Sequence, residues 1–353
     1  MEIGGEIFSL EKGKVKDYCR QLNLKTGELC RKVRWVSPAG DEVEILFQRI
    51  VSMKDLHVAA QKITLTSVNH DVKLKLVPGI DGSVTNSGVQ HFSEGDKRFY
   101  DGKYMQSCQT TTETKLNFVF TSACEFKENG QPCEMQKLIV MDRRKISCEY
   151  TKELKAGQTL VIEKISNVYT SRDQEHTGKT VQELQETGLC ALKESSKKGY
   201  DTLAAESAAV WEERVWSRMP VVIESDNPMD QFAVRFAQYH LYTMTPAHDN
   251  RMNIGAKGLS GEGYKGHTFW DTDIFALPYF TFTDPAVARS LEEYRYLSLP
   301  GAHQKAKGNH YEGAQFPWES AWLDDGLRTA QAFSPSVPHS TEWQSPDSSG
   351  PYN

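Results

Sequence analysis

The chain has 353 residues, which is enough for two domains with cores of their own. It has a formal net charge of −6 and seven cysteines. Because positive charge is not in excess, a nucleic-acid partner is not expected. The cysteine count is odd and the spacing contains no metal-binding pairs, which favours a reducing, cytoplasmic compartment. No apolar run is long enough to cross a bilayer, so no membrane association is expected.

Residues 1–200 are predicted to form an antiparallel β-sandwich domain, because short runs rich in β-branched residues recur with turns between them. Val72–Leu76 alternates between apolar and polar residues, and Asn129-Gly130 is typical of a hairpin turn. Residues 1–15 show no clear start of a domain. The pattern fits a carbohydrate-binding module equally well. The runs expected as strands are Lys32–Val36, Val43–Val51, Lys62–Val68, Val72–Val77, Lys115–Ser122, Lys137–Met141 and Thr159–Ile165.

Apolar residues recur at helical spacing after residue 180, and residues 201–226 are predicted to be a helical linker to a second domain. Trp211 and Trp216 belong to this stretch. They could be flat platforms for a ligand, but packing at a domain interface is the favoured role for large aromatic residues at this place.

Residues 227–326 are predicted to begin a ring of helical hairpins that is not complete. The residues at 226–228 form a helix start signal for a helix over 227–245. A second helix is expected over 284–299, and Pro300 should start a third that ends at Gly308. Two loops with acidic residues interrupt these helices.

These loops place large aromatic rings directly before carboxylates. A glycine-rich stretch delivers Phe269, Trp270 and Asp271, and the motif returns at Trp318 and Glu319. An aromatic face stacks on the C–H face of a pyranose ring, and a carboxylate accepts hydrogen bonds from neighbouring hydroxyls. The five residues are therefore candidates for a sugar-binding site.

Three further patterns in this part of the chain could indicate functions other than sugar binding. Gly261–Gly266 has the spacing of a dinucleotide-binding loop, but no apolar strand precedes it. Asp271 and Glu319 could be the acid and base of an inverting glycosidase, or they could only hold sugar hydroxyls. Four histidines show no paired metal-ligand spacing, so no metal site is expected among them: His240, His248, His267 and His310.

Four segments of the chain resemble the disaccharide phosphorylases of glycoside hydrolase family 65, the group of maltose, kojibiose, nigerose and trehalose phosphorylases. The two longer ones read GEGYKGHTFWDTDIFALPYF and EYRYLSLPGAHQKAKGNHYEGAQFPWESAWLDDG. The earlier RQLNLKTGELCRKVRW and ILFQRIVSMKDLHVAA resemble the N-terminal β-sandwich of that family. The resemblance spans most of Glu6 to Gly326.

The resemblance implies an (α/α)6 barrel of which residues 227–326 are the first part. It also implies inverting phosphorolysis, in which inorganic phosphate attacks an α-linked glucose disaccharide to give β-glucose 1-phosphate and glucose. Phosphate is a co-substrate and no cofactor is expected. A homodimer is a candidate assembly of the full-length parent. Trp270, Asp271, Trp318 and Glu319 match positions that line the glucosyl subsite, which favours binding over proton donation.

Two departures from the family are expected to matter. The general acid of the family is the Glu of a Gly-Pro-Asp-Glu-Tyr-His-type segment later in the barrel, and this sequence contains no such segment. Residues 327–353 are rich in Ser and Pro and are expected to be a disordered tail. We therefore expect a fragment truncated at both ends and inactive alone. The alternatives are a hydrolase of the α-glucosidase or trehalase type and a non-catalytic sugar-binding fragment.

Overall fold

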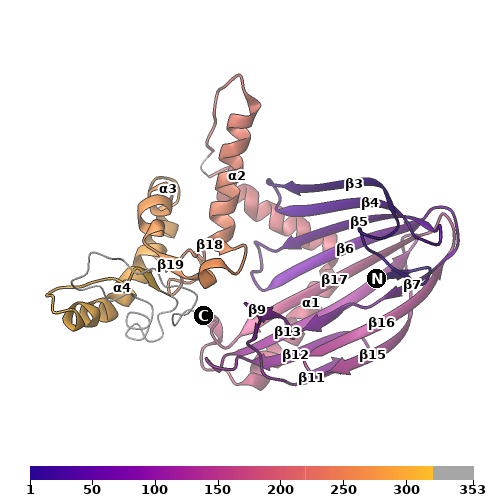
Figure 1. The fold of residues 1–353 in the computed structure, drawn as a ribbon, viewed down its shortest axis with the longest axis horizontal. Coiled ribbons are helices and arrows are strands. Elements are labelled where there is room, and N and C mark those ends of the chain that lie inside the picture. Colours follow the sequence, from indigo (N-terminus) through magenta and orange to yellow (C-terminus); the bar gives the residue numbers. More distant parts are fainter. Residues whose placement is uncertain (219, 321–353) are drawn as a thin grey trace. The chain divides into compact units, whose positions relative to one another are not determined.

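The structure is a computed structural model that describes residues 1–218 and 220–320. It divides into two compact units at Arg218 and Met219 (Figure 1). The expected tail over 327–353 lies outside the described residues. Among residues 1–218 and 220–320, no helix is long and apolar enough to span a membrane.

The first unit contains two main antiparallel sheets (Figure 1). The large sheet runs in the order β11 (Lys97–Tyr100), β12 (Tyr104–Thr110), β13 (Asn117–Glu128), β17 (Thr159–Thr170), β6 (Val58–Ser67), β5 (Glu42–Val51), β4 (Glu28–Val36) and β3 (Lys14–Asn23), with β14 (Gln131–Pro132) beside β13. The second sheet runs in the order β15 (Gln136–Asp142), β16 (Lys145–Leu154), β7 (Val72–Leu76), β1 (Glu2–Ile3) and β2 (Glu6–Ile7), with β8 (Gly79–Asp81) beside β16. β9 (Thr85–Asn86) and β10 (Val89–Gln90) form a small separate ladder.

The main core lies between these two sheets and makes the first unit a sandwich. Trp35 and Leu65 of the large sheet pack in one cluster with Leu74 and Ile146 of the second sheet. The side chains of β7 alternate between buried and more exposed positions, as the sequence predicted. Burying one such Leu or Ile side chain contributes about 1.5–3 kcal/mol. The expectation of an N-terminal antiparallel sheet domain followed by helices is confirmed.

Helix α1 (Val181–Trp211) covers the other face of the large sheet, where Leu192 and Leu203 pack with Ile165. It begins earlier than the expected boundary at residue 200. The reason is a capping box, in which Thr180 and Glu183 satisfy each other's backbone N–H groups. After the short π-helix η2 (Glu212–Trp216), residues 220–227 are not helical, so the expected linker is helical only in its first part.

Trp211 and Trp216 pack against the sheet unit and are not ligand platforms. Their exposed fractions are 2% and 8%, and their rings stack with centroids 6.0 Å apart. The Trp216 indole N–H donates to the backbone carbonyl of Lys25 at 2.9 Å. Both rings are therefore packed, and the contacts described for them lie within the first unit, while packing at a domain interface stays a prediction.

Gly199 is the point at which α1 bends. Its φ of 74° lies in the left-handed region that favours glycine. The bend lets the backbone N–H of Tyr200 donate to the buried carboxylate of Glu163 at 3.1 Å, and Lys127 donates to the same carboxylate at 2.9 Å. A Cβ at Gly199 would lie 3.1 Å from a Glu163 oxygen. The backbone conformation therefore favours glycine, and an added Cβ would also crowd the Glu163 carboxylate.

The second unit is mainly helical. Its elements are α2 (Pro228–Met244), β18 (Ala256–Leu259), the 3-10 turn η3 (Gly263–Gly266), β19 (Thr268–Phe269), the π-helix η4 (Thr272–Ala276), α3 (Leu277–Thr283), α4 (Pro285–Gly308) and β20 (Glu319–Ser320). The start of α2 agrees with the sequence, because the Asn227 side chain accepts from the N–H of Met229 at 3.1 Å.

The prediction that Pro300 separates two helices is wrong. α4 is one helix from Pro285 to Gly308 with Pro300 inside it. Proline removes one backbone donor and crowds the preceding turn, which costs about 3 kcal/mol in an isolated helix. Burial of residues on both sides of the proline, including Leu291, Tyr294 and Ala302, offsets this cost.

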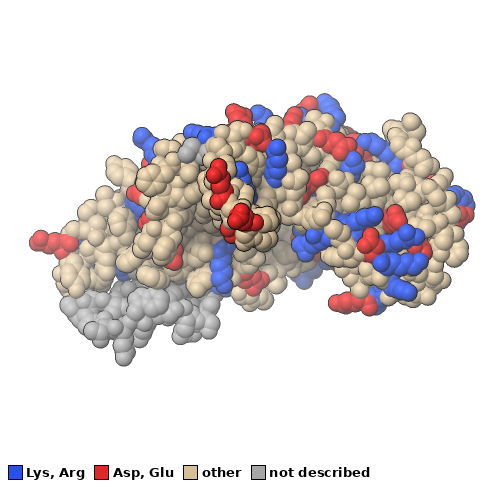
Figure 2. Space-filling model, turned by 90° about the horizontal axis from the view of Figure 1, so that it is seen from above, with Lys and Arg blue, Asp and Glu red and all other residues tan. Residues whose placement is uncertain are grey.

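Charged side chains are mixed over the surface seen in Figure 2, where Lys and Arg alternate with Asp and Glu over the face shown. Many charged side chains of the first unit form ion pairs, such as Lys62 with Asp201 at 2.8 Å and Lys145 with Asp81 at 2.8 Å. Such exposed pairs contribute little to stability. The mixture of positive and negative side chains leaves the face in Figure 2 without the broad positive field typical of nucleic-acid binding.

Two glycines of α1 provide a matched test of the fold. Gly199→Ala should lower the free energy of unfolding by about 1–2 kcal/mol, because alanine disfavours the left-handed region. Gly188→Ala should be neutral or raise it by up to about 1 kcal/mol, since its Cβ would meet Val119 at an ordinary contact distance of 3.4 Å. Urea unfolding followed by circular dichroism measures both. Equal effects would contradict the described bend.

Candidate functional site

The glycine-rich stretch before the first aromatic–acid segment folds into β18 and η3. Tyr264 and Lys265 have φ values of 60° and 54°, which few residues other than glycine adopt. The loop is closed by a hydrogen bond from the N–H of Ala256 to the carbonyl of His267 at 3.1 Å. Burial, together with the charge of Lys265, lowers the pKa of His267 to about 4, so this imidazole is neutral at pH 7.

The two aromatic–acid segments meet through a short pair of strands. β19 and β20 are antiparallel, with Thr268 opposite Ser320 and Phe269 opposite Glu319. The phenol of Tyr294, on α4, lies 2.5 Å from the hydroxyl of Ser320. Two segments that lie far apart in the sequence are therefore brought together at one place on the second unit.

The tryptophans of the two segments form one aromatic pair. The rings of Trp270 and Trp318 have centroids 5.3 Å apart and are tilted by 59°. The indole N–H of Trp270 donates to the backbone carbonyl of Pro317 at 2.7 Å, which fixes the ring. Trp270 is 41% exposed and Trp318 is half-buried. Part of the Trp270 ring is therefore available to stack on a ligand.

Phe269 differs from the other candidates because it is only 5% exposed. Its ring makes edge-to-face contacts with Tyr264 at 5.2 Å and with Trp318 at 6.2 Å. It packs against the tryptophan pair in the interior. The expectation that Phe269 presents a flat face to a ligand does not fit this burial. Its apolar neighbours give it the role of packing.

The carboxylates that follow Trp270 have different environments. Asp271 is exposed, and it makes no hydrogen bond or ion pair with the residues that the structure describes. Asp273 is held by Arg295 of α4, whose guanidinium nitrogens lie 2.5 and 3.2 Å from the carboxylate. The same guanidinium donates to the carbonyl of Phe269 at 3.1 Å. Asp273 therefore fixes the loop, while Asp271 remains available for a ligand.

Glu319 is described only by its backbone, in β20 opposite Phe269. Sequence reasoning missed Arg295 and Ser320, which hold the two segments in place. Arg295 lies within α4, where one arginine among other charged and apolar residues has no motif that would mark it. The interpretation of Gly261–Gly266 as a dinucleotide loop gains no support, because η3 is a short turn and the described part of the second unit has no βαβ unit around it.

Comparison with models of protein families gives two matches. Residues 1–214 match the model described as the N-terminal domain of glycosyl hydrolase family 65. Residues 235–350 match the model described as the central catalytic domain of the same family. The second match contains both aromatic–acid segments and extends past Gly326.

Comparison with known proteins gives relatives that are longer than this chain. It is 45% identical over 336 residues to a kojibiose phosphorylase of Halothermothrix orenii, covering 94% of this chain and 42% of the relative. It is 31% identical over 330 residues to an α,α-trehalose phosphorylase of Thermoanaerobacter brockii, covering 90% and 41%. A solved structure, described as a candidate kojibiose phosphorylase from the human microbiome, shares the fold with a TM-score of 0.79 at 24% identity, covering 90% and 41%. The chain spans about two-fifths of the length of these relatives.

The different environments of the two aspartates can be tested by amide substitution. Asp273→Asn should lower the free energy of unfolding by about 1.5–3 kcal/mol, because Arg295 loses a charged, two-pronged partner. Asp271→Asn is the matched control, and at an exposed position it should change this free energy by less than about 0.5 kcal/mol. Urea unfolding followed by tryptophan fluorescence measures both. A large effect of Asp271→Asn alone would contradict the assignment.

Proposed function

Because the chain belongs to glycosyl hydrolase family 65, we propose that it is part of a disaccharide phosphorylase that acts on an α-linked glucose disaccharide. The relatives it matches are named as phosphorylases of kojibiose and of trehalose. The observation that carries the proposal is the β19–β20 pairing, which brings the two aromatic–acid segments side by side.

The proposed reaction exchanges one bond at the anomeric carbon. An oxygen of inorganic phosphate forms a bond to this carbon while the bond to the glycosidic oxygen breaks. A carboxylic acid gives its proton to the leaving oxygen, and the products are β-glucose 1-phosphate and glucose, with inversion. Phosphate is already an anionic nucleophile, so no general base is required.

The residues of this chain would serve to bind and orient the glucosyl ring. The exposed part of Trp270, fixed by its bond to Pro317, provides a stacking surface next to Trp318. Asp271 is positioned as an acceptor for sugar hydroxyls, because no described residue competes for it. Glu319 directly follows Trp318 in the sequence, as Asp271 follows Trp270. None of these groups is assigned as the proton donor.

We also propose that the helices of the second unit are the first of an (α/α)6 barrel. The helical region after β19 presents large apolar side chains to solvent, with Phe275 74% exposed and Phe282 81% exposed. A surface of this kind is typical of a face that another element covers. Further barrel helices, like those in the family, are the occupants that we propose.

The main alternative is a hydrolase on the same scaffold. The phosphorylase proposal is tested with a protein that contains the whole catalytic domain, given kojibiose, trehalose, nigerose or maltose with and without phosphate. Formation of glucose 1-phosphate only with phosphate is the expected result. Release of glucose at an equal rate without phosphate would establish a hydrolase and contradict the proposal.

Asp271→Asn in that protein should lower kcat/KM by about 10- to 100-fold, which corresponds to the loss of one or two charge-assisted hydrogen bonds. Trp270→Ala should lower it by about tenfold or more, through loss of stacking. Asp226→Asn, at another exposed aspartate of the second unit, is the control and should leave kcat/KM unchanged. Wild-type activity of both site variants would contradict the assignment.

The 353-residue chain alone should bind glucose or maltose weakly and form no detectable glucose 1-phosphate. Loss of a general acid alone lowers a rate by about 10²–10⁴-fold, and this sequence lacks the segment that carries the acid in the family. Calorimetric titration measures the binding, and an assay for glucose 1-phosphate measures the product. Product formation that Asp271→Asn abolishes would show that these residues perform the chemistry. Heat without product is the expected result, and the absence of heat at millimolar sugar would contradict sugar binding by this chain.

A further inference from the structure

Three side chains of the first unit gather beside the ends of β5, β6 and β17, three interior strands of the large sheet, where no function has been assigned so far. His57 lies in the turn between β5 and β6, and Glu175 and His176 lie in the 3-10 turn η1 (Gln174–His176) after β17. One ligand atom from each of the three lies within 4.8 Å of the others. More than a hundred residues of sequence separate His57 from the other two, so spacing gave no sign of the cluster.

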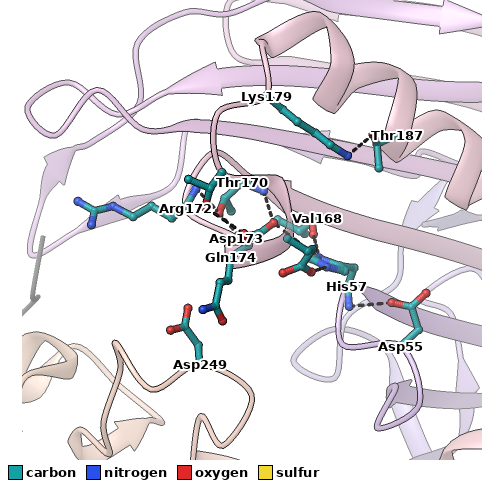
Figure 3. A network of polar contacts seen from close by, with 12 residues as sticks. Asp55, His57, Val168, Thr170, Arg172, Asp173, Gln174, Lys179, Thr187 and Asp249 are labelled. Atoms are coloured by element: carbon teal, nitrogen blue, oxygen red, sulfur yellow. Dashed lines mark hydrogen bonds and ion pairs between the residues drawn. The ribbon is translucent and has the colours of Figure 1, made fainter. Parts of the chain in front are cut away.

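The orientation of His57 is fixed by its surroundings (Figure 3). Its Nδ1 lies 2.8 Å from the carbonyl of Val168, and because a carbonyl only accepts, Nδ1 carries a proton. Its ring stacks on Tyr169 with centroids 4.0 Å apart. Nε2 therefore faces the cluster, 2.9 Å from a Glu175 oxygen. Metal-binding histidines have this arrangement, with one nitrogen bonded to a backbone carbonyl and the other free to ligate.

His176 gives a second and independent sign of a missing partner. Its side chain is 92% buried, since its exposed fraction is 8%, and neither ring nitrogen has a hydrogen-bond partner in the described part of the chain. Buried polar atoms are nearly always satisfied by protein, water or an ion. The ring points toward the cluster, with its centroid 5.9 Å from that of His57.

The loop that carries the cluster is held in place by its own hydrogen bonds. Asp173 accepts from the backbone N–H and the hydroxyl of Thr170, both at 2.6 Å (Figure 3). In the β5–β6 turn, the backbone N–H of His57 donates to the carboxylate of Asp55 at 3.1 Å. Both histidines are therefore on backbone that is fixed before any ion arrives, while Glu175 is more than half exposed and free to adjust.

We propose that His57, Glu175 and His176 form a binding site for a first-row transition-metal dication, with Zn²⁺ as the best fit. Two imidazole nitrogens, one carboxylate oxygen and a water molecule are a known ligand set for zinc. Mg²⁺ and Ca²⁺ prefer all-oxygen sites and do not fit. Ligand atoms around tetrahedral zinc lie about 3.3 Å apart, so side-chain rotation must close the cluster by about 1.5 Å.

The competing explanation is a metal-free ion pair. Burial disfavours the charged form of His57, but the hydrogen bonds to Glu175 and Val168 and the charge of Asp173 outweigh this and raise its pKa. In this explanation His57 and Glu175 pair as imidazolium and carboxylate, and a water molecule bonds to His176. A metal ion would displace the Nε2 proton of His57 and would take the place of that water.

Titration of the chelator-treated chain with Co²⁺ and Zn²⁺ separates the two explanations. We expect one equivalent to bind, visible d–d absorption of nitrogen- and oxygen-bound cobalt, and a higher Tm with zinc. Charge-transfer bands in the near ultraviolet would instead indicate cysteine ligands and would overturn the proposal. Absence of any binding at millimolar metal would overturn it as well.

His176→Phe is the decisive variant. It should weaken metal binding by about 100-fold or more, yet without metal its Tm should equal or exceed that of the wild type, because it removes two unsatisfied buried nitrogens. His70→Gln, at an exposed histidine of the same unit, is the matched control and should bind metal normally. Unchanged metal affinity in His176→Phe, or a lower Tm without metal, would contradict the proposed site.

Discussion

The first unit depends on burial of both faces of its large sheet. One face contributes Trp35 and Leu65 to the core of the sandwich, and the other contributes Ala123 and Ile165 to the surface beneath α1. A sheet buried on both sides cannot shift its register by one residue without exchanging two apolar sets. The requirement also explains why α1 bends at a glycine, since the helix has to follow the twisted sheet while it leaves the carboxylate of Glu163 satisfied.

The candidate sugar site depends on a much smaller element. A ladder of two residues per strand has little stability of its own, so β19 and β20 need support from their surroundings. Arg295 provides it from α4 through Asp273 and the carbonyl of Phe269, and Tyr294 provides it through Ser320. The packing that fixes Trp270 and the ion pair that occupies Asp273 leave Asp271 as the carboxylate free to meet a ligand.

Local sequence patterns predicted individual helices and strands better than they predicted which elements pair or pack together. Alternation in β7 and the helix start at Asn227 act within a few residues, and both agree with the structure. Ile3 is fully buried although the opening residues show no pattern, because two-residue strands are too short to display a period. The pairing of β19 with β20 and the role of Arg295 are contacts across long stretches of chain, which spacing does not encode. Pro300 was misinterpreted because burial along α4 outweighs local propensity.

Polar side chains that have protein partners differ in role from those that do not. Glu163 and Asp273 are each satisfied by cationic or backbone donors, so substitution there affects stability. Asp271 has no partner among the described residues but is exposed, so water can satisfy its carboxylate. His176 is buried and has no hydrogen-bond partner among the residues that the structure describes, a combination that costs about 1–3 kcal/mol unless another partner is bound. The unsatisfied, buried His176 lies beside His57, whose ring orientation is fixed. Together they provide the ligands for the ion that we propose, which neither histidine could hold alone.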